Sequence, residues 1–207
     1  MAVALALMLT LMMVSATTLA KIPIEQFFSE ADYVAIVEVI QGRTLGGPSD
    51  NCGAIYTGHV IQGFKGIETG TIEFGHDRGR EIGGRYLLFL TKSGRTYEQL
   101  MSTNSMMFRL EQEHHRRCGQ FLKANHIMQR GIGALKITWT SEYNYKQAVQ
   151  VPLEFVGLPV GLDRKKADLG ERGQLDDVVW VLETRMIDFL QTLADKTLSN
   201  PGLQPAR

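Results

Sequence analysis

The sequence lacks a net charge, because its 22 Lys and Arg residues balance 22 Asp and Glu residues among 207 positions. Proteins that recruit nucleic acid or anionic membranes through their overall field carry a marked basic excess, so the composition argues against both functions. Hydrophobic residues make up 44% of the chain, which is ordinary for a globular protein and sufficient for one sizeable core. We therefore expect one main globular domain.

The sequence also lacks the short motifs of common enzyme chemistry. It contains no G-x-S-x-G nucleophile elbow, no H-E-x-x-H zinc pair, no G-x-x-x-x-G-K phosphate loop and no dinucleotide-binding fingerprint. The sequence therefore predicts no catalytic residue, no cofactor and no metal site, and it favours a non-enzymatic function.

Two polar clusters leave an alternative open. His76 and Asp77 could form an acid–base pair in a loop, and His114 and Cys118 would share one face of a helix at a spacing that suits a metal. Neither cluster has a third group at an identifiable spacing, so solvated polar loops are the preferred interpretation. The alternative hypothesis is a hydrolase whose site combines His76, Asp77 and the region of His114 and His115.

Charge is absent from the first twenty residues, which are mainly Ala, Leu, Met and Val. An apolar run that ends in small residues is typical of a signal peptide, and we place the cleavage after Ala20. Cleavage after Ala16 and an uncleaved membrane anchor are the alternatives. The mature chain is then expected to be periplasmic or secreted, without a stable membrane span after cleavage.

Cysteine is scarce, with only Cys52 and Cys118 in the chain. An even count in an exported protein favours one disulfide between them, which would stabilise the fold by roughly 4 kcal/mol. The alternative is two separate buried thiols. A redox-active pair is less favoured because the sequence has no C-x-x-C.

What is present is a series of strand patterns that follows a short helix. Residues 24–30 can form two helical turns with Ile24, Phe27 and Phe28 on one side, where they would plug an open end of a barrel. Alternation or β-branched runs predict four strands, at residues 33–40, 52–64, 71–74 and 85–91. The last of these is apolar almost throughout, which predicts burial on both faces.

The second half of the chain predicts further strands and one long helix. We expect a strand at residues 120–129. Residues 135–139 alternate and can pair with residues 149–153, where Pro152 indicates an edge position. A charged, Gly-containing stretch precedes the helix, which Asp176 or Asp177 can cap. Apolar residues recur there at steps of three and four: Val178, Leu182, Met186, Phe189, Leu190 and Leu193. Docking of this stripe on the chain's own barrel is preferred over self-association or partner binding.

The ordered set of these features resembles a known family. A short helix leads into Ala31-Asp32-Tyr33-Val34, a strand carries Cys52 and ends in Phe64-Lys65-Gly66, and a third segment reads Gly84-Arg85-Tyr86-Leu87-Leu88-Phe89-Leu90. This pattern is similar to the netrin/tissue-inhibitor-of-metalloproteinase-like (NTR/TIMP-like) group and its exported bacterial members. The resemblance implies an OB-type, five-stranded Greek-key barrel and a disulfide that ties the second strand to a later segment.

The inhibitory device of that family is missing. Its inhibitors grip a zinc ion with a disulfide-bonded amino-terminal cysteine, whereas this mature chain would begin Lys21-Ile22-Pro23. Barrels of the OB type also bind oligonucleotides through aromatic and basic strand faces, but Tyr56, Phe74 and Tyr86 are not interleaved with basic residues. Nucleic acid is therefore not an expected partner.

These observations predict a mainly β protein with helical additions, an OB-like five-stranded Greek-key barrel and a C-terminal amphipathic helix. The expected segments are a signal peptide at residues 1–20, the barrel with a C-terminal hairpin at 21–160, a linker at 161–173 and a helix packed on the barrel at 174–198. The predicted function is an exported module that binds a protein or an envelope component. A hydrolase-type enzyme with a loop-built site and a metalloproteinase inhibitor-like protein are the alternatives.

Overall fold

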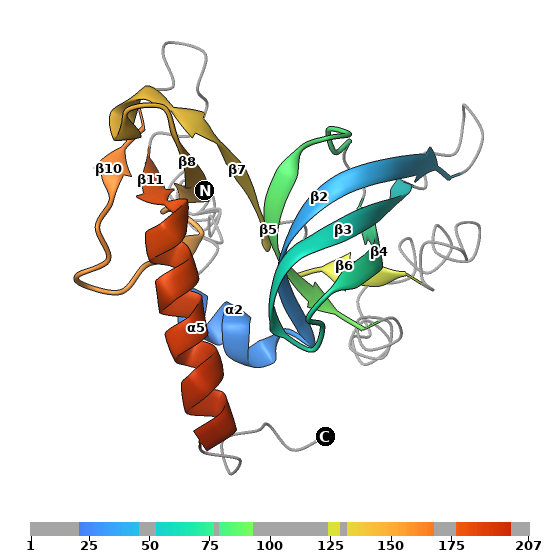
Figure 1. Cartoon of the computed structure of the whole chain (residues 1–207), viewed down its shortest axis with the longest axis horizontal. Helices are drawn as coiled ribbons and strands as arrows, with labels where there is room; N and C mark the ends of the chain where they lie inside the picture. Colours follow the sequence, from blue (N-terminus) through green and yellow to red (C-terminus); the bar gives the residue numbers. More distant parts are fainter. Residues whose placement is uncertain are drawn as a thin grey trace, which may run out of the picture.

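A closed barrel and a second group of strands with a long helix beside it make up the described part of the protein (Figure 1). The structure is a computed structural model that describes residues 21–45, 53–76, 79–92, 124–128, 132–167 and 177–199. The predicted signal peptide, Cys52 and Cys118 lie outside the described residues, so cleavage and the disulfide stay predictions. Within the described part of the chain, no helix is long and apolar enough to cross a membrane.

Five strands form the barrel. Their order is β5-β2-β3-β4-β6, and pairing between β5 and β6 closes the ring. Read around the closed ring from β2, the order is β2-β3-β4-β6-β5. In chain order these are the first, second, third, fifth and fourth barrel strands, which is the Greek-key order of an OB barrel. The β4–β6 pair is parallel and the others are antiparallel. The predicted fold class is therefore confirmed, with β2 (Tyr33–Thr44), β3 (Ala54–Lys65), β4 (Gly70–His76), β5 (Arg85–Thr91) and β6 (Asn125–Ile127).

Alternation of side chains fills the barrel. On β3, Tyr56, Gly58 and Val60 point inward, while the residues between them are partly or fully exposed. A methyl group on Gly58 would lie 3.1 Å from the Cβ of Val37, so the glycine allows β2 and β3 to approach closely. The interior contains a continuous apolar cluster: Ala35, Val37, Val39, Ala54, Tyr56, Val60, Ile72, Phe74, Tyr86, Leu88, Leu90 and Ile127.

Strand β5 joins the barrel to the rest of the molecule. Its inward residues Tyr86, Leu88 and Leu90 belong to the barrel interior, whereas Leu87 and Phe89 face a second core outside it. The predicted burial of both faces is thus confirmed. One edge of β5 pairs with β2, and the other is shared, first by β7 and then by β6.

From β5 the sheet continues through four more strands, in the order β7-β8-β11-β10. The predicted hairpin is confirmed as β7 and β8, joined by the short 3-10 helix η3, and a separate parallel pair joins β1 to β9. Strand β8 is central rather than at an edge, but Pro152 lies at its end, beyond the last residue that pairs with β7. The bounds are β7 (Ala134–Thr140), η3 (Ser141–Tyr143), β8 (Lys146–Pro152), β10 (Lys165–Lys166), β11 (Val178–Leu182), β1 (Ile22–Pro23) and β9 (Val156–Gly157).

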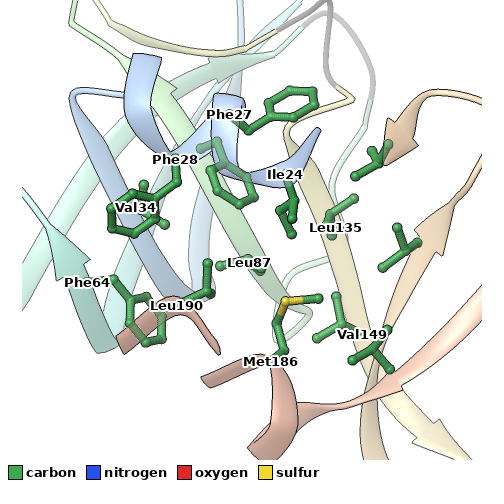
Figure 2. Packing of buried hydrophobic residues seen from close by; sticks show 14 of the residues in the cluster. Ile24, Phe27, Phe28, Val34, Phe64, Leu87, Leu135, Val149, Met186 and Leu190 are labelled. Carbon is green, nitrogen blue, oxygen red and sulfur yellow. The ribbon is translucent and has the colours of Figure 1, made fainter. Parts of the chain in front are cut away.

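The short helix α2 (Ile24–Glu30) packs outside the barrel rather than plugging its end. Its buried residues Ile24, Phe27 and Phe28 contact the outward face of β2 and β5, together with Met186 of the long helix α5 (Figure 2). Lys65 at the end of β3 donates hydrogen bonds to the last carbonyl groups of α2, at 2.9 and 2.8 Å. This contact matches a cation to the negative end of the helix and holds α2 beside β3.

Helix α5 (Glu183–Ser199) begins later than the periodicity predicts, because Val178–Leu182 forms strand β11 instead. The run is rich in valine, gains backbone partners from β8 and β10, and is buried on both faces. From Glu183 onward the apolar stripe packs on the chain's own sheet through Met186 and Leu190, in the core outside the barrel interior. Part of the predicted linker, Lys165–Lys166, forms β10, and residues 168–173 lie outside the described part.

Candidate functional site

The end of β4 carries the one sequence-predicted candidate that the structure describes, His76. Its side chain is 4% exposed, and its Nε2 lies 3.1 Å from Nη2 of Arg80. A guanidinium group only donates hydrogen bonds, so Nε2 is the acceptor in this contact. His76 is therefore a buried and engaged histidine.

Two tyrosines hold the loop before β5 over this end of the barrel. The Tyr56 ring stacks on Phe74 inside the barrel, with centroids 5.7 Å apart, and its hydroxyl accepts the backbone N–H of Arg80 at 2.9 Å. The Tyr86 hydroxyl accepts the backbone N–H of Glu81 at 3.3 Å, and the Arg80 guanidinium lies 5.3 Å from the Tyr86 ring centroid. These contacts give the tyrosine hydroxyl groups hydrogen-bond partners and hold the loop over the end of the barrel, so both tyrosines have a structural role.

At the rim of this loop, Glu81 and Lys136 form a solvent-exposed ion pair at 2.8 Å. The hydrogen bond from Lys136, with its charge, lowers the pKa of the Glu81 carboxyl group and in return raises the pKa of Lys136. Such exposed pairs contribute little to stability. The pair orders the rim but supplies no chemistry.

The predicted acid–base and metal clusters are not assembled by the described residues. Asp77, His114, His115 and Cys118 lie outside them, and His76 faces Arg80 rather than an open surface. No group of three His, Cys, Asp or Glu side chains within the described ranges could hold a metal ion. The hydrolase hypothesis gains no support from the placement of His76.

A second cluster, which the sequence did not single out, lies where α5 begins. Trp139 on β7 is directly opposite Gln147 on β8. On the other side of β8, the last residue of β11 pairs with Ala148, so the next residue in the chain, Glu183, comes level with Gln147. The three residues therefore form a row across the sheet. Arg85 of β5 joins them: its Nη1 donates to Oε1 of Gln147, and its Nη2 lies 2.7 Å from Oε1 of Glu183. We call these four residues the indole row.

The indole row combines an exposed aromatic with a fixed polar network. Trp139 is 65% exposed, although alternation places it on the same face as the buried Leu135 and Ile137. Helix α5 starts at Glu183 and packs Met186 and Leu190 against those inner rows, while Trp139 stays exposed. The side chains of Arg85 and Glu183 are 23% and 11% exposed, and Arg85 Nε is buried without a hydrogen-bond partner in the described part of the chain.

The turn of the same hairpin exposes a second aromatic residue. Asn144 and Tyr145 both have positive φ, 53° and 57°, and Tyr145 is 75% exposed. A tyrosine in the left-handed region is unusual and costs backbone energy. Its neighbour Tyr143 instead turns inward, donates to the Trp180 carbonyl oxygen at 3.3 Å and stacks under Lys165. Burial raises the pKa of Tyr143.

The face of the barrel that OB folds use for oligonucleotides has a different character. Its outward side chains from Ile55 to Ile61 on β3 and on β4 include no Phe, Tyr, Trp, Lys or Arg residue, in contrast to the stacking platforms of single-strand binders. They are Ile55, Thr57, His59, Ile61, Thr71 and Glu73.

Comparison of this chain with protein-family models, with curated proteins and with solved structures gives no match. The resemblance to the NTR/TIMP-like group therefore stays a prediction from the sequence. The function has to be argued from the residues themselves.

Proposed function

We propose that the chain is an exported, non-enzymatic module that binds a protein or another component of the cell envelope through its β7–β8 hairpin. The observation that carries this proposal is the exposure of two large aromatics, Trp139 and Tyr145, on one hairpin. Export is supported by the apolar segment at residues 1–20.

Energetics support binding at this hairpin. Trp and Tyr are the residues most enriched among the energetic centres of interfaces. Burying about 150 Å² of an aromatic side chain contributes roughly 4 kcal/mol at 25 cal/mol per Å². A protein that leaves both Trp139 and Tyr145 in water gives up this stabilisation when alone and recovers it when a partner covers them.

The two other parts of the described structure are less suited to ligands. The barrel interior is filled by its own apolar cluster, and its open end is closed by the loop that Tyr56 and Tyr86 hold. His76 is buried beneath that loop. Among the described residues, the hairpin carries both of the large aromatic side chains that are exposed.

Binding can be tested with the mature chain, residues 21–207, in a co-sedimentation assay with an isolated envelope fraction. We expect the wild type to sediment with the fraction and the double variant Trp139→Ala/Tyr145→Ala to bind about tenfold or more weakly, which corresponds to about 1.4 kcal/mol or more. Ile61→Ala removes an exposed apolar residue from the barrel instead and should bind normally. Wild-type binding no stronger than that of an unrelated OB barrel, or unchanged binding of the double variant, would refute the proposal.

A further inference from the structure

We propose that the indole row of Trp139, Gln147, Arg85 and Glu183 is a saccharide-binding site, and that the envelope component recognised by the hairpin is a glycan. This inference rests on the proposed function and names the ligand class. The argument depends on three properties of the row: its span, its hydrogen-bonding groups and its charge.

The span of the row fits one or two sugar rings. Neighbouring strands lie 4.7–4.9 Å apart, so the row from β7 through β8 to the end of β11 covers about 10 Å. Trp139 stands at one end with its indole exposed, and Glu183 stands at the other, where α5 begins. A pyranose ring can stack one C–H face on the indole while its hydroxyl groups extend along the row.

The polar groups of the row are planar and fixed in place. Arg85 occupies the amide oxygen of Gln147 and one carboxylate oxygen of Glu183. The NH₂ group of Gln147 and the second oxygen of Glu183 are left to offer a donor and an acceptor to a ligand. Sugar hydroxyl groups both donate and accept, so they need such a pair, and a pair already held by Arg85 loses little entropy on binding.

The charge of the row favours a neutral, hydroxyl-rich ligand. The Arg85 guanidinium and the Glu183 carboxylate neutralise each other at 2.7 Å. A phosphate-rich ligand such as nucleic acid would meet the carboxylate, and the only cation of the row is already engaged by it. A protein partner would favour further apolar surface beside the indole, whereas the neighbours of Trp139 along the row are Gln147 and Glu183.

The experiment uses soluble cellotetraose, maltotetraose and tetra-N-acetylchitotetraose as probes, titrated to about 10 mM into the mature chain. Binding is followed by tryptophan emission and by the indole N–H resonances, of which the chain has two, from Trp139 and the buried Trp180. We expect at least one probe to shift the Trp139 resonance and leave that of Trp180 in place. Isothermal titration calorimetry should show the binding lost in Trp139→Ala and weakened by about tenfold in Gln147→Ala.

Two variants make the result specific. Ile61→Ala removes an exposed apolar side chain of the barrel, away from the row, and should keep the saccharide affinity of the wild type. Trp139→Phe keeps a smaller ring and should recover part of the affinity that Trp139→Ala loses. Thermal melts of Trp139→Ala and Gln147→Ala check folding, and Trp139→Ala is expected to fold normally because the indole is exposed.

The outcomes separate this inference from the proposed function. If no probe shifts the Trp139 resonance while the envelope fraction still binds the wild type and not Trp139→Ala/Tyr145→Ala, the glycan inference is wrong and the binding function stands. If neither the probes nor the envelope fraction bind, both are wrong. Saccharide binding that survives Trp139→Ala would also overturn the assignment of the site.

Discussion

The ion pair between Arg85 and Glu183 provides the sharpest test of how the barrel and the long helix are held together. Arg85 is the first residue of β5 in the barrel wall, and Glu183 is the first residue of α5. The perturbation is a double-mutant cycle with Arg85→Met, Glu183→Ala and the combined variant. Methionine keeps the packing of the arginine stem while it removes the charge.

The structure determines the expected magnitude. Exposed ion pairs contribute about 0.2–1 kcal/mol, and removal of one partner from a fully buried pair costs about 3–5 kcal/mol. With a separation of 2.7 Å and side-chain exposures of 23% and 11%, this pair lies between the two cases. We therefore expect a coupling energy of about 2 kcal/mol. Glu183→Ala should cost about 0.5 kcal/mol more than the coupling, because it also removes a carboxylate from the first turn of a helix.

The assay is urea unfolding of the four proteins at pH 7, with the midpoint converted to a free energy through the common slope. The coupling should persist at about 0.5 M salt, because screening acts mainly on exposed charges. A coupling energy below about 0.5 kcal/mol, or its disappearance in salt, would show that the pair behaves as an ordinary surface contact and would refute the reasoning.

Three further predictions address the core, the barrel and a buried tyrosine. Leu190→Ala should lower the free energy of unfolding, measured in urea, by about 2–5 kcal/mol because the side chain is fully buried. Leu198→Ala changes an 82% exposed position and should alter it by less than about 0.5 kcal/mol. Similar costs for the two variants would contradict the packing of α5. Gly63→Ala places the new Cβ 1.8 Å from a backbone carbonyl oxygen and should lower the free energy of unfolding, followed by thermal melting, by about 3 kcal/mol or more. Gly79→Ala meets open space and should be tolerated. Equal melting temperatures for the two variants would disprove the close approach at Gly63. Because the pKa of Tyr143 is raised in the folded state, its contribution to stability is complete below pH 10 and is lost as the pH rises through the folded pKa. Tyr143→Phe should therefore reduce the loss of unfolding free energy at alkaline pH. An unchanged loss would count against burial of the hydroxyl group.

Strand β3 illustrates how much of the barrel is readable from local pattern. That Tyr56, Gly58 and Val60 share one face follows from the two-residue period of a strand, and the structure shows that this face is the inward one. The long apolar run of β5 likewise indicates burial on both faces before any partner is known. Strands of these kinds carry their own orientation in the sequence.

The segment before α5 illustrates where local pattern is insufficient. Val178, Leu182 and Met186 are four residues apart and extend a helical stripe, yet the first two belong to β11. A strand buried on both faces has no polar alternation, so its apolar run cannot be distinguished from a helix by periodicity. The pairing of β11 with β8 and β10 decides the matter, and it depends on residues distant in the sequence.

The indole row was out of reach of sequence reasoning for a similar reason. Arg85, Trp139, Gln147 and Glu183 come from four separate elements, and no spacing along the chain connects them. Alternation even predicts a buried environment for Trp139, since it follows Leu135 and Ile137 on the same face. Its exposure is decided by the residue at which α5 starts and by the direction in which the helix runs.

The sequence by itself determined the class of the fold, the residues that share one face of a barrel strand and the apolar stripe of the C-terminal helix, because these depend on periods of two to four residues. Only the tertiary structure decided that the barrel closes through β5 and β6, that His76 is engaged by Arg80, and that a tryptophan and three polar side chains form one row. The physical reason is that closure, burial and a shared site arise from contacts between residues as many as 98 positions apart. No local preference encodes such contacts.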